Sequence, residues 1–356
     1  MNSQKLKVGI ACSAETHELY IGKTELAQLR EFADVSFIEI EDPNSGWVRP
    51  LLDEELEAQM CQFVEDIDAL IVCHGAPYVS ERVIAAAPNL KLIGDLEGDR
   101  FAHRIDTAAA HEAGVVVVDT THSSSWPVSE WALALILVGL RQQARFRDII
   151  EGKEMSHDDY RTDPPARELT GRTVGLIGFG RIAWRLREFL APFRVRVIAH
   201  DPFAPRELAD ALDVDFAPLD KVMGCEIVVC LVPQTPTTVG MIGARELELL
   251  PEDAVFVNVS RGLVVDRPAL EAKAAKNDAW FGLDAHDPEP IAVDTPLRGM
   301  RNVFLSPHIG GMTVEAQPRF FELMVRELAR FHEGVEPRAE LTPRALQGRG
   351  TAVDAR

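Results

Sequence analysis

A short glycine-containing segment has the residue types and spacing of a phosphate-binding turn. Residues 173–183 read TVGLIGFGRIA, which places Gly178, Gly180 and Ala183 after a strand-like run and at the head of a helical one. In a turn of this kind the first glycine permits a tight bend, the second lets backbone approach a pyrophosphate, and the third, small residue lets the helix pack on the strand. The pattern predicts a dinucleotide site. The alternative is a merely structural strand–helix turn.

The next strand-like run ends in an acid that helps to decide between these alternatives. Asp201 follows RVRVIAH, about twenty residues beyond the glycines, where a carboxylate can accept hydrogen bonds from both hydroxyls of an adenosine ribose. The same charge would repel a 2′-phosphate, which favours NAD over NADP as the cofactor. Arg206 lies a few residues on and keeps NADP open. Asp201 could also simply cap the turn before Pro202.

Three downstream segments carry polar residues in a distinctive order. They read NVSRG at 258–262, DAHDPEP at 284–290 and SPHIGG at 306–311. Together with the glycine turn, they resemble the signatures of the D-isomer-specific 2-hydroxyacid dehydrogenases, and the resemblance covers about residues 69–341. It implies an α/β fold in two domains, one Rossmann-type and NAD-binding, one flavodoxin-like and substrate-binding, with a cleft between them. It also implies hydride transfer between NAD(H) and a D-2-hydroxy acid or its 2-keto acid.

The resemblance assigns the catalytic roles of that family to Arg261, Glu289 and His308. Oxidation of a secondary alcohol removes a hydride from carbon and a proton from oxygen, and a histidine can take that proton near neutral pH. A carboxylate on the far ring nitrogen would orient the histidine and favour its protonated form. The planar guanidinium of Arg261 could hold the substrate carboxylate and polarise the C2 oxygen. Asp287 is an alternative partner for His308.

Weaker assignments follow from the same resemblance. Pro233 and Thr235 match the loop that passes the nicotinamide ribose, and Asp284 matches an acid near the carboxamide. Arg181 and Ile182 should lie over the pyrophosphate through their backbone amides. No histidine–carboxylate spacing suggests a metal site.

The expected substrate loop departs from the family's glycine-rich pattern. The residues that match its carboxylate-binding amides are Leu96, Glu97 and Gly98, within a segment that also carries Asp95 and Asp99. Three acids would repel an anion unless they face solvent or Arg100 compensates for them. The simpler expectation is that the acids face solvent while the backbone amides bind the substrate. The alternative is an atypical substrate, polar or cation-bearing at its far end. The VCHGAP segment at 72–77 has no arginine where phosphoglycerate-type members place one, so a phosphorylated substrate is not supported.

Strand-like and helical patterns alternate along the chain in two series, which predicts two parallel α/β units. By the resemblance, residues 1–119 and 310–345 form the substrate domain and residues 120–309 the nucleotide domain. A tail at 346–356 is expected to be flexible. The apolar helix from Trp131 to Leu140 matches the element that crosses between subunits in family dimers, so we expect a homodimer.

Composition narrows the function classes. The 356 residues carry 37 basic and 56 acidic side chains, a net charge of −19, so nucleic acid and anionic membranes are poor partners. No apolar run is long enough to cross a bilayer, no signal peptide is recognisable, and five dispersed cysteines fit reduced thiols in a cytoplasm. The main alternative to an enzyme is an NAD(H)-sensing, corepressor-like binding protein without significant turnover.

Overall fold

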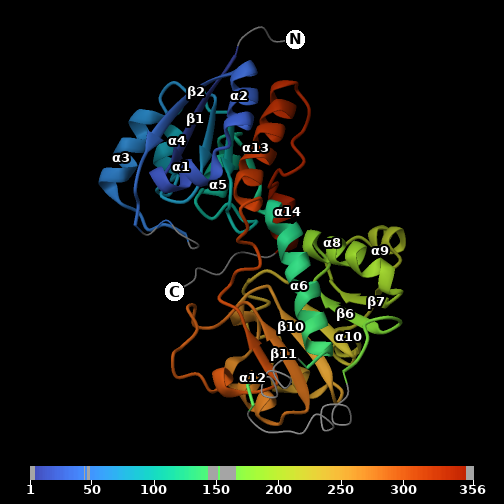
Figure 1. Ribbon diagram of the computed structural model, residues 1–356. Coiled ribbons are helices and arrows are strands. Elements are labelled where there is room, and N and C mark those ends of the chain that lie inside the picture. The colour runs from blue at the N-terminus through green and yellow to red at the C-terminus, as the bar shows by residue number, and fades with distance from the viewer. Residues whose placement is uncertain (1–4, 44, 46–48, 143–150, 153–165, 350–356) are drawn as a thin grey trace. The chain divides into compact units, whose positions relative to one another are not determined.

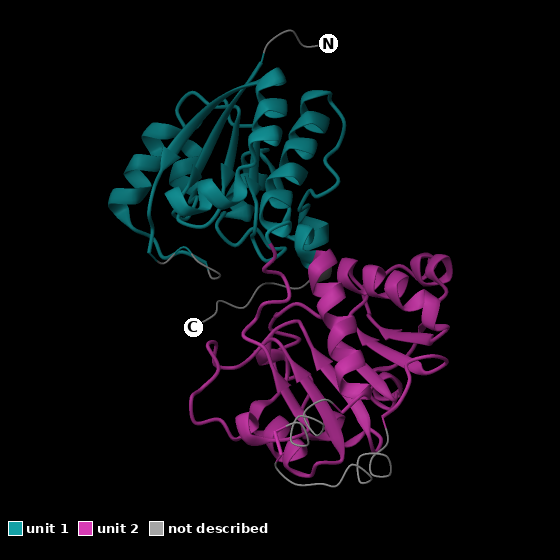
Figure 2. Cartoon of the chain, in the orientation of Figure 1, with its two compact units in different colours: residues 1–124, 314–356 teal, residues 125–313 magenta. Residues whose placement is uncertain are grey.

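The computed structural model describes residues 5–43, 45, 49–142, 151–152 and 166–349. The chain forms two compact units, which Figure 2 distinguishes by colour. Unit 1 comprises residues 1–124 and 314–356, and unit 2 comprises residues 125–313. The two units divide after Ser124 and after Thr313, where the sequence led us to expect divisions after residues 119 and 309. Of the tail expected at 346–356, residues 346–349 belong to a helix and 350–356 lie outside the described residues.

Unit 1 is built on a five-stranded parallel sheet in the order β2-β1-β3-β4-β5. This order is that of flavodoxin-like folds. The strands are β1 (Leu6–Cys12), β2 (Ala33–Glu39), β3 (Ala69–Val72), β4 (Leu92–Asp95) and β5 (Val116–Asp119). Its helices are α1 (Ala14–Tyr20), α2 (Lys23–Phe32), α3 (Glu54–Phe63), α4 (Glu81–Ala85), α5 (Thr107–Glu112), α13 (Ala316–His332) and α14 (Pro343–Arg349), with a 3₁₀ turn at Thr121–Ser124 (Figure 1).

Local sequence signals explain where these helices begin. The side chains of Ser13, Asp53, Ser80 and Asp106 each accept a hydrogen bond from a backbone amide in the first turn of α1, α3, α4 and α5. A capping side chain of this type satisfies an amide that the helix itself leaves unpaired. These four polar residues therefore determine where the helices begin after the strands and loops that precede them.

The C-terminal helix α13 returns to complete the core of unit 1. Its side chains Phe320, Phe321, Met324 and Leu328 are almost fully buried, in the same cluster as apolar residues of β1, β3 and β4. The hydroxyl of Thr120 also donates a hydrogen bond to the carbonyl of Phe320, at 3.1 Å. Unit 1 is thus discontinuous in sequence.

Unit 2 contains a seven-stranded parallel sheet in the order β12-β11-β10-β9-β6-β7-β8, a Rossmann-type arrangement. Its strands are β6 (Thr173–Ile177), β7 (Arg196–His200), β8 (Asp215–Phe216), β9 (Ile227–Cys230), β10 (Ala254–Asn258), β11 (Ala279–Leu283) and β12 (Val303–Leu305). Its helices are α6 (Ser125–Leu140), α8 (Arg181–Leu190), α9 (Arg206–Leu212), α10 (Leu219–Met223), α11 (Ala244–Glu248) and α12 (Arg267–Ala275), with 3₁₀ turns at Ala191–Phe193, Gly262–Val264 and Pro296–Gly299.

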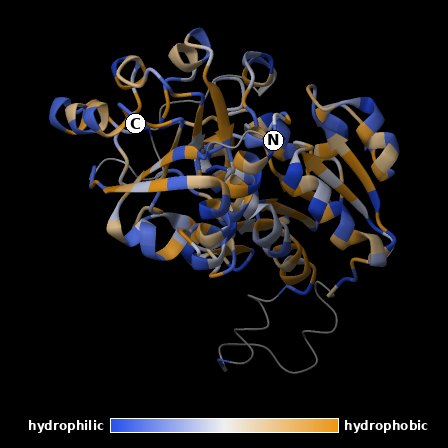
Figure 3. Cartoon of the chain, turned by 90° about the horizontal axis from the view of Figure 1, so that it is seen from above, coloured by the Kyte–Doolittle hydropathy of each residue, from blue (hydrophilic) through white to orange (hydrophobic). Residues whose placement is uncertain are grey.

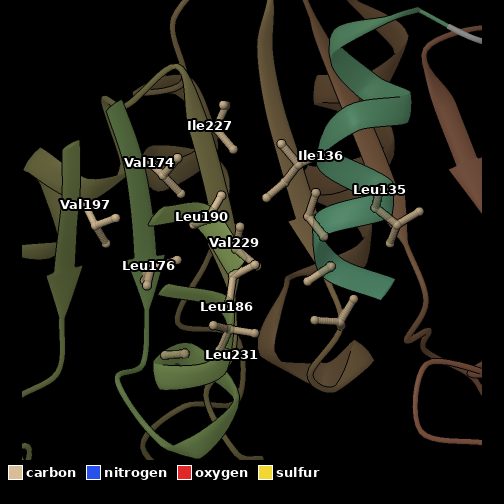
Figure 4. Packing of buried hydrophobic residues seen from close by; sticks show 14 of the residues in the cluster. Leu135, Ile136, Val174, Leu176, Leu186, Leu190, Val197, Ile227, Val229 and Leu231 are labelled. Atoms are coloured by element: carbon tan, nitrogen blue, oxygen red, sulfur yellow. The ribbon is translucent and has the colours of Figure 1, made fainter. Parts of the chain in front are cut away.

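The sheet of unit 2 is covered on both faces, so its central strands are buried and almost entirely apolar. All residues of β9 and β10 are buried, as expected when helices cover a parallel sheet. Figure 4 shows Leu186 and Leu190 of α8 beside side chains of β6 and β9, while Leu135 and Ile136 of α6 belong to the same cluster and lie over β10 and β11. In Figure 3 the strands are mostly orange and the helices carry bands of blue and orange, which is the amphipathic pattern of surface helices.

The cysteines are free, as the sequence predicted. Cys12, Cys73, Cys225 and Cys230 are buried and Cys61 is partly exposed. Burial raises the pKa of all five thiols, to about 12 for Cys12 and about 11 for Cys225 and Cys230.

Within the described part of the chain no helix is both long and apolar enough to cross a membrane.

Candidate active site

The glycine turn lies where the sequence placed it, between β6 and α8 of unit 2. Gly178 has a φ of 91°, a conformation that residues with a Cβ rarely adopt. A Cβ there would also lie 2.9 Å from the Val232 side chain. Gly180 is the N-cap of α8 and has no side chain to satisfy the first amides of the helix, while Ala183 is fully buried beneath it. These amides and the close backbone fit the phosphates of a dinucleotide.

Asp201 follows β7 and is tied to the glycine turn. Its Oδ2 accepts a hydrogen bond from the backbone amide of Phe179 at 2.8 Å, and its Oδ1 accepts from the amides of Phe203 and Ala204 at 2.8 and 3.0 Å. The carboxylate therefore stabilises its own turn and also lies beside the pyrophosphate-type loop. Arg206, which kept NADP open, begins α9 and is exposed.

Arg261 follows β10 in a turn that Asn258 shapes. The buried Asn258 accepts hydrogen bonds through Oδ1 from the amide and hydroxyl of Ser260, and its Nδ2 donates to the carbonyl of Arg261 at 3.1 Å. One guanidinium nitrogen of Arg261 donates to the carbonyl of Ser260 at 2.7 Å. A Cβ on Gly262 would lie 1.8 Å from the carbonyl oxygen of His286, so only glycine lets the two loops pack this closely.

Glu289 and His308 form a direct pair, with Oε1 of the carboxylate 2.8 Å from Nδ1 of the ring. Their side chains are 38 and 32% exposed, so the pair is open to solvent on one side. Partial burial raises the pKa of Glu289, but the hydrogen bond and charge of His308, with the charges of Arg261 and His286, bring that pKa below its ordinary value. Glu289, rather than the alternative Asp287, thus makes the hydrogen bond to His308. The positive charge of Arg261 helps to lower the pKa of the same carboxylate.

The backbone around His308 is held by Asp284, which is buried at the end of β11. Oδ1 of Asp284 accepts hydrogen bonds from the Ser306 hydroxyl at 2.5 Å and from the Ile309 amide at 3.0 Å, and Oδ2 accepts from the Gly310 amide at 2.9 Å. His308 itself has a φ of 54°, which is uncommon for a residue other than glycine. The buried carboxylate therefore holds the loop in a conformation that its own residues do not favour.

Two further side chains support this loop. The indole nitrogen of Trp131 in α6 donates to Asp284 Oδ1 and Ser306 Oγ at 3.2 and 3.1 Å. The buried His286 lies with Nε2 2.7 Å from the carbonyl of Ser306, so this nitrogen carries the proton that it donates. Sequence reasoning missed Asn258, Trp131, Ser306 and His286 as supports of the site. Three of the four lie inside the motif segments, whereas nothing in the sequence connects Trp131 to the histidine loop.

The loop after β9 contains Pro233 and Thr235 and is closed on itself. The Thr238 hydroxyl donates to the carbonyl of Pro233 at 2.6 Å and accepts from the amide of Thr235 at 2.8 Å. The Thr235 hydroxyl is buried and lies 3.0 Å from that of Thr237. These contacts give the loop a defined shape, and its contact with a cofactor stays a prediction.

The 96–98 loop of unit 1, which we expected to bind a substrate carboxylate through its amides, differs from the expectation that its acids face solvent. Asp95 and Glu97 are buried, so the prediction that the acids face solvent was wrong for both. The amide of Leu96 donates to the carbonyl of Val72 at 3.0 Å, and the amide of Glu97 lies 3.2 Å from Asp95 Oδ1. Two of the three expected amides are therefore engaged within the unit. The physical reason is the fully buried Arg104, which draws Asp95 inward.

Comparison with known proteins places the chain in a family. Residues 133–310 match the model for the NAD-binding domain of D-isomer specific 2-hydroxyacid dehydrogenases. The chain is 32% identical over 271 residues to a D-3-phosphoglycerate dehydrogenase of Archaeoglobus fulgidus, covering 75% of this chain and 50% of that protein. It is 31% identical over 288 residues to a glyoxylate reductase of Korarchaeum cryptofilum, covering 77% of this chain and 82% of that protein.

The fold of the chain is also found in solved structures. One is a phosphoglycerate oxidoreductase from Rhizobium etli, with a TM-score of 0.80 and 20% identity, covering 96% of this chain and all of that one. The chain spans about half the length of the phosphoglycerate dehydrogenases that it matches. The family model and the glyoxylate reductase match nevertheless agree with the motifs and the fold. The chain belongs to the D-isomer-specific 2-hydroxyacid dehydrogenase family.

Proposed function

We propose that this protein is an NAD-dependent oxidoreductase that interconverts a D-2-hydroxy acid and its 2-keto acid. The observation that carries the proposal is the hydrogen bond between Glu289 and His308, in the same unit as the glycine turn and Asp201. When bound, the nicotinamide supplies or accepts the hydride at C2 of the substrate. The residues of the chain must then bind the acid, move one proton and stabilise charge on the C2 oxygen.

His308 is the group proposed to move the proton. Because the pKa of Glu289 is lowered, its carboxylate is ionised near neutral pH and can only accept a hydrogen bond. The hydrogen in the pair therefore resides on Nδ1 of His308, which leaves Nε2 with a lone pair in the neutral ring. Nε2 can then take the hydroxyl proton during oxidation, and the imidazolium returns it during reduction.

Arg261 is proposed to bind the substrate carboxylate and to polarise the C2 oxygen. A guanidinium presents a planar fork of donors and remains charged at all working pH values, so it can stabilise negative charge that develops on oxygen. The Asn258 turn fixes the backbone from which this side chain extends. From unit 1, the 96–98 loop is proposed to contact the substrate, so that unit 1 is the substrate domain and unit 2 the nucleotide domain.

NAD is the proposed cofactor rather than NADP. Asp201 Oδ2 keeps a second lone pair besides the one used by the Phe179 amide, so it can accept a ribose hydroxyl, whereas a 2′-phosphate would meet its negative charge. Arg181 and Ile182 are proposed to lie over the pyrophosphate, and Pro233, Thr235 and Asp284 near the nicotinamide side.

A homodimer through α6 is the proposed assembly. One side of this helix is buried in the core of unit 2, and its other side carries the partly buried Leu133, Leu137 and Val138 together with the exposed Glu130. A helix with apolar residues on both sides is usually covered on both sides, and a second copy of the chain would cover the outer side of this one. The free thiols fit a reducing compartment such as the cytoplasm, where we place the protein.

The activity can be tested by NADH consumption with a panel of 2-keto acids. We expect turnover with the wild type and a ~10²–10⁴-fold lower kcat in His308→Ala, because the proton donor is removed, with NADH binding retained in a fluorescence titration. Asp294→Asn, an exposed acid of the same unit, serves as the control and should match the wild type. Tight NADH binding without turnover on any acid would favour the corepressor-like alternative and overturn the proposal.

The role of Asp284 in holding the loop around His308 can be tested with Asp284→Asn. An amide has one acceptor oxygen and cannot satisfy all the donors around Asp284, so the free energy of unfolding should fall by ~1–3 kcal/mol in urea titrations. The loosened loop should also displace His308, and a displacement of about 1 Å should lower kcat/KM by up to ~100-fold. An Asp284→Asn protein with wild-type stability and kinetics would show that this carboxylate does not hold the loop.

Cofactor choice can be tested with Asp201→Asn, which removes the charge and keeps an acceptor oxygen. The wild type should prefer NADH to NADPH, and the variant should lose at least ~10-fold of that preference in kcat/KM, since about 1.4 kcal/mol of repulsion corresponds to tenfold. Glu252→Gln is the matched control, because Glu252 is exposed and precedes β10, at the opposite edge of the sheet. A wild type that prefers NADPH would contradict the assignment.

Assembly can be measured by sedimentation velocity. The wild type should sediment as a dimer at micromolar concentration, and Leu137→Glu should shift it towards the monomer, because a charge replaces part of the apolar face of α6. A wild type that stays monomeric at these concentrations would refute the dimer.

A further inference from the structure

A second group of polar side chains lies at the carboxyl edge of the sheet in unit 1. We define the Glu97 cluster as Tyr20, His74, Glu97 and Arg104. His74 follows β3 and Glu97 follows β4, while the amide of Ser13, directly after β1, donates to the carbonyl of His74 at 2.9 Å. In an open sheet of this strand order, ligands bind beyond the carboxyl ends of the strands, at the switch point between β1 and β3. The cluster lies at this position.

Hydrogen bonds fix the protonation of the cluster. A guanidinium nitrogen of Arg104 lies 2.7 Å from Nδ1 of His74, and because arginine can only donate, Nδ1 must accept. The hydrogen of His74 is therefore on Nε2, which donates to Oε2 of Glu97 at 3.0 Å. The Tyr20 hydroxyl is 2.6 Å from the same oxygen. Oε2 of Glu97 therefore accepts two hydrogen bonds, from His74 and from Tyr20.

Arg104 is paired directly with another acid of the loop. Its guanidinium is fully buried, pairs with the fully buried Asp95 at 3.0 Å, and also donates to the backbone carbonyl of Glu97 at 2.8 Å. Burial, together with the charge of Asp95, raises the pKa of the nearby Asp119 to about 7, so this carboxyl adds negative charge only as the pH rises through neutrality. Arg104 thus has two acids close to it, Asp95 and Glu97, and the carboxyl group of Asp119 lies nearby.

Two side chains of the cluster reach the surface to a small extent, His74 at 16% and Glu97 at 10% exposed. The amides of Leu96 and Glu97, which would otherwise attract an anion, are engaged with Val72 and Asp95. A partly open carboxylate with bound neighbours attracts a hydrogen-bond donor and repels an anion. This is the opposite of what a phosphate-binding site requires.

On the basis of the proposed function, we propose that Glu97 is a specificity-determining residue of unit 1. It accepts a hydrogen bond from a hydroxyl on the part of the 2-keto or 2-hydroxy acid remote from the reacting carboxylate, and it disfavours substrates with a second anionic group, phosphate included. The chain would then differ in substrate from the relatives named D-3-phosphoglycerate dehydrogenase.

Three keto acids of one carbon skeleton test this proposal: pyruvate, hydroxypyruvate and 3-phosphohydroxypyruvate. The wild type with NADH should give the highest kcat/KM with hydroxypyruvate, a lower value with pyruvate, and a value at least ~10-fold below that of hydroxypyruvate with the phosphorylated acid. In Glu97→Gln, which keeps the shape and removes the charge, the ratio of hydroxypyruvate to phosphohydroxypyruvate should fall at least ~10-fold. Equal use of both acids by the wild type, or an unchanged ratio in Glu97→Gln, would overturn the inference.

Two further variants separate charge from packing. Glu31→Gln removes an equal charge from an exposed position at the end of α2, at the opposite edge of the sheet, and should leave all three values unchanged. Tyr20→Phe removes a donor to Glu97 without changing the charge, so discrimination against phosphate should persist in it. If the ratio collapses in Tyr20→Phe as fully as in Glu97→Gln, packing rather than charge sets the preference and the inference fails. Absence of turnover by the wild type on all three acids would instead refute the proposed function.

Discussion

The geometry of unit 2 depends on a single buried carboxylate. Asp284 accepts hydrogen bonds from Trp131 of α6, from Ser306 and from the backbone that follows His308, and it does so where water cannot compete for those hydrogen bonds. The imidazole can therefore face Glu289 even though its backbone has a positive φ. A residue that carries no part of the proposed proton transfer thus determines where the proton-transferring group lies.

The sequence was informative wherever function imposes a local pattern. The turn at Gly178, the acid at Asp201 and the pairing of Glu289 with His308 could all be predicted, because each depends on residues close in sequence or on an ordered set of motifs. The two parallel sheets could also be predicted, since alternating apolar strands and amphipathic helices leave few other arrangements. The return of α13 to unit 1 required the family resemblance.

What the sequence did not reveal depends on burial. Asp95 and Glu97 were expected to face solvent, because most charged residues are exposed, and only the folded chain shows the fully buried Arg104 beside Asp95. Trp131 reads as one more apolar residue of a helix, although its indole nitrogen bonds to Asp284. The partner of Trp131 is 153 residues away and that of Asp95 only nine, but no local periodicity in the sequence records either pairing. The candidate site of unit 2 could therefore be predicted from sequence motifs, whereas the buried charges of unit 1 became visible only in the folded chain.

The discontinuity of unit 1 affects how the chain can fold during synthesis. Its core lacks Phe320, Phe321 and Met324 until the ribosome has already produced every strand of unit 2. Unit 2 is continuous, so it can form its contacts first, whereas the N-terminal strands must wait with one apolar face uncovered. Closing a loop of this length adds little entropy cost beyond that of a shorter one, so the delay is one of timing rather than of final stability. Nascent chains that stall before α13 emerges would expose this apolar face to chaperones or to aggregation.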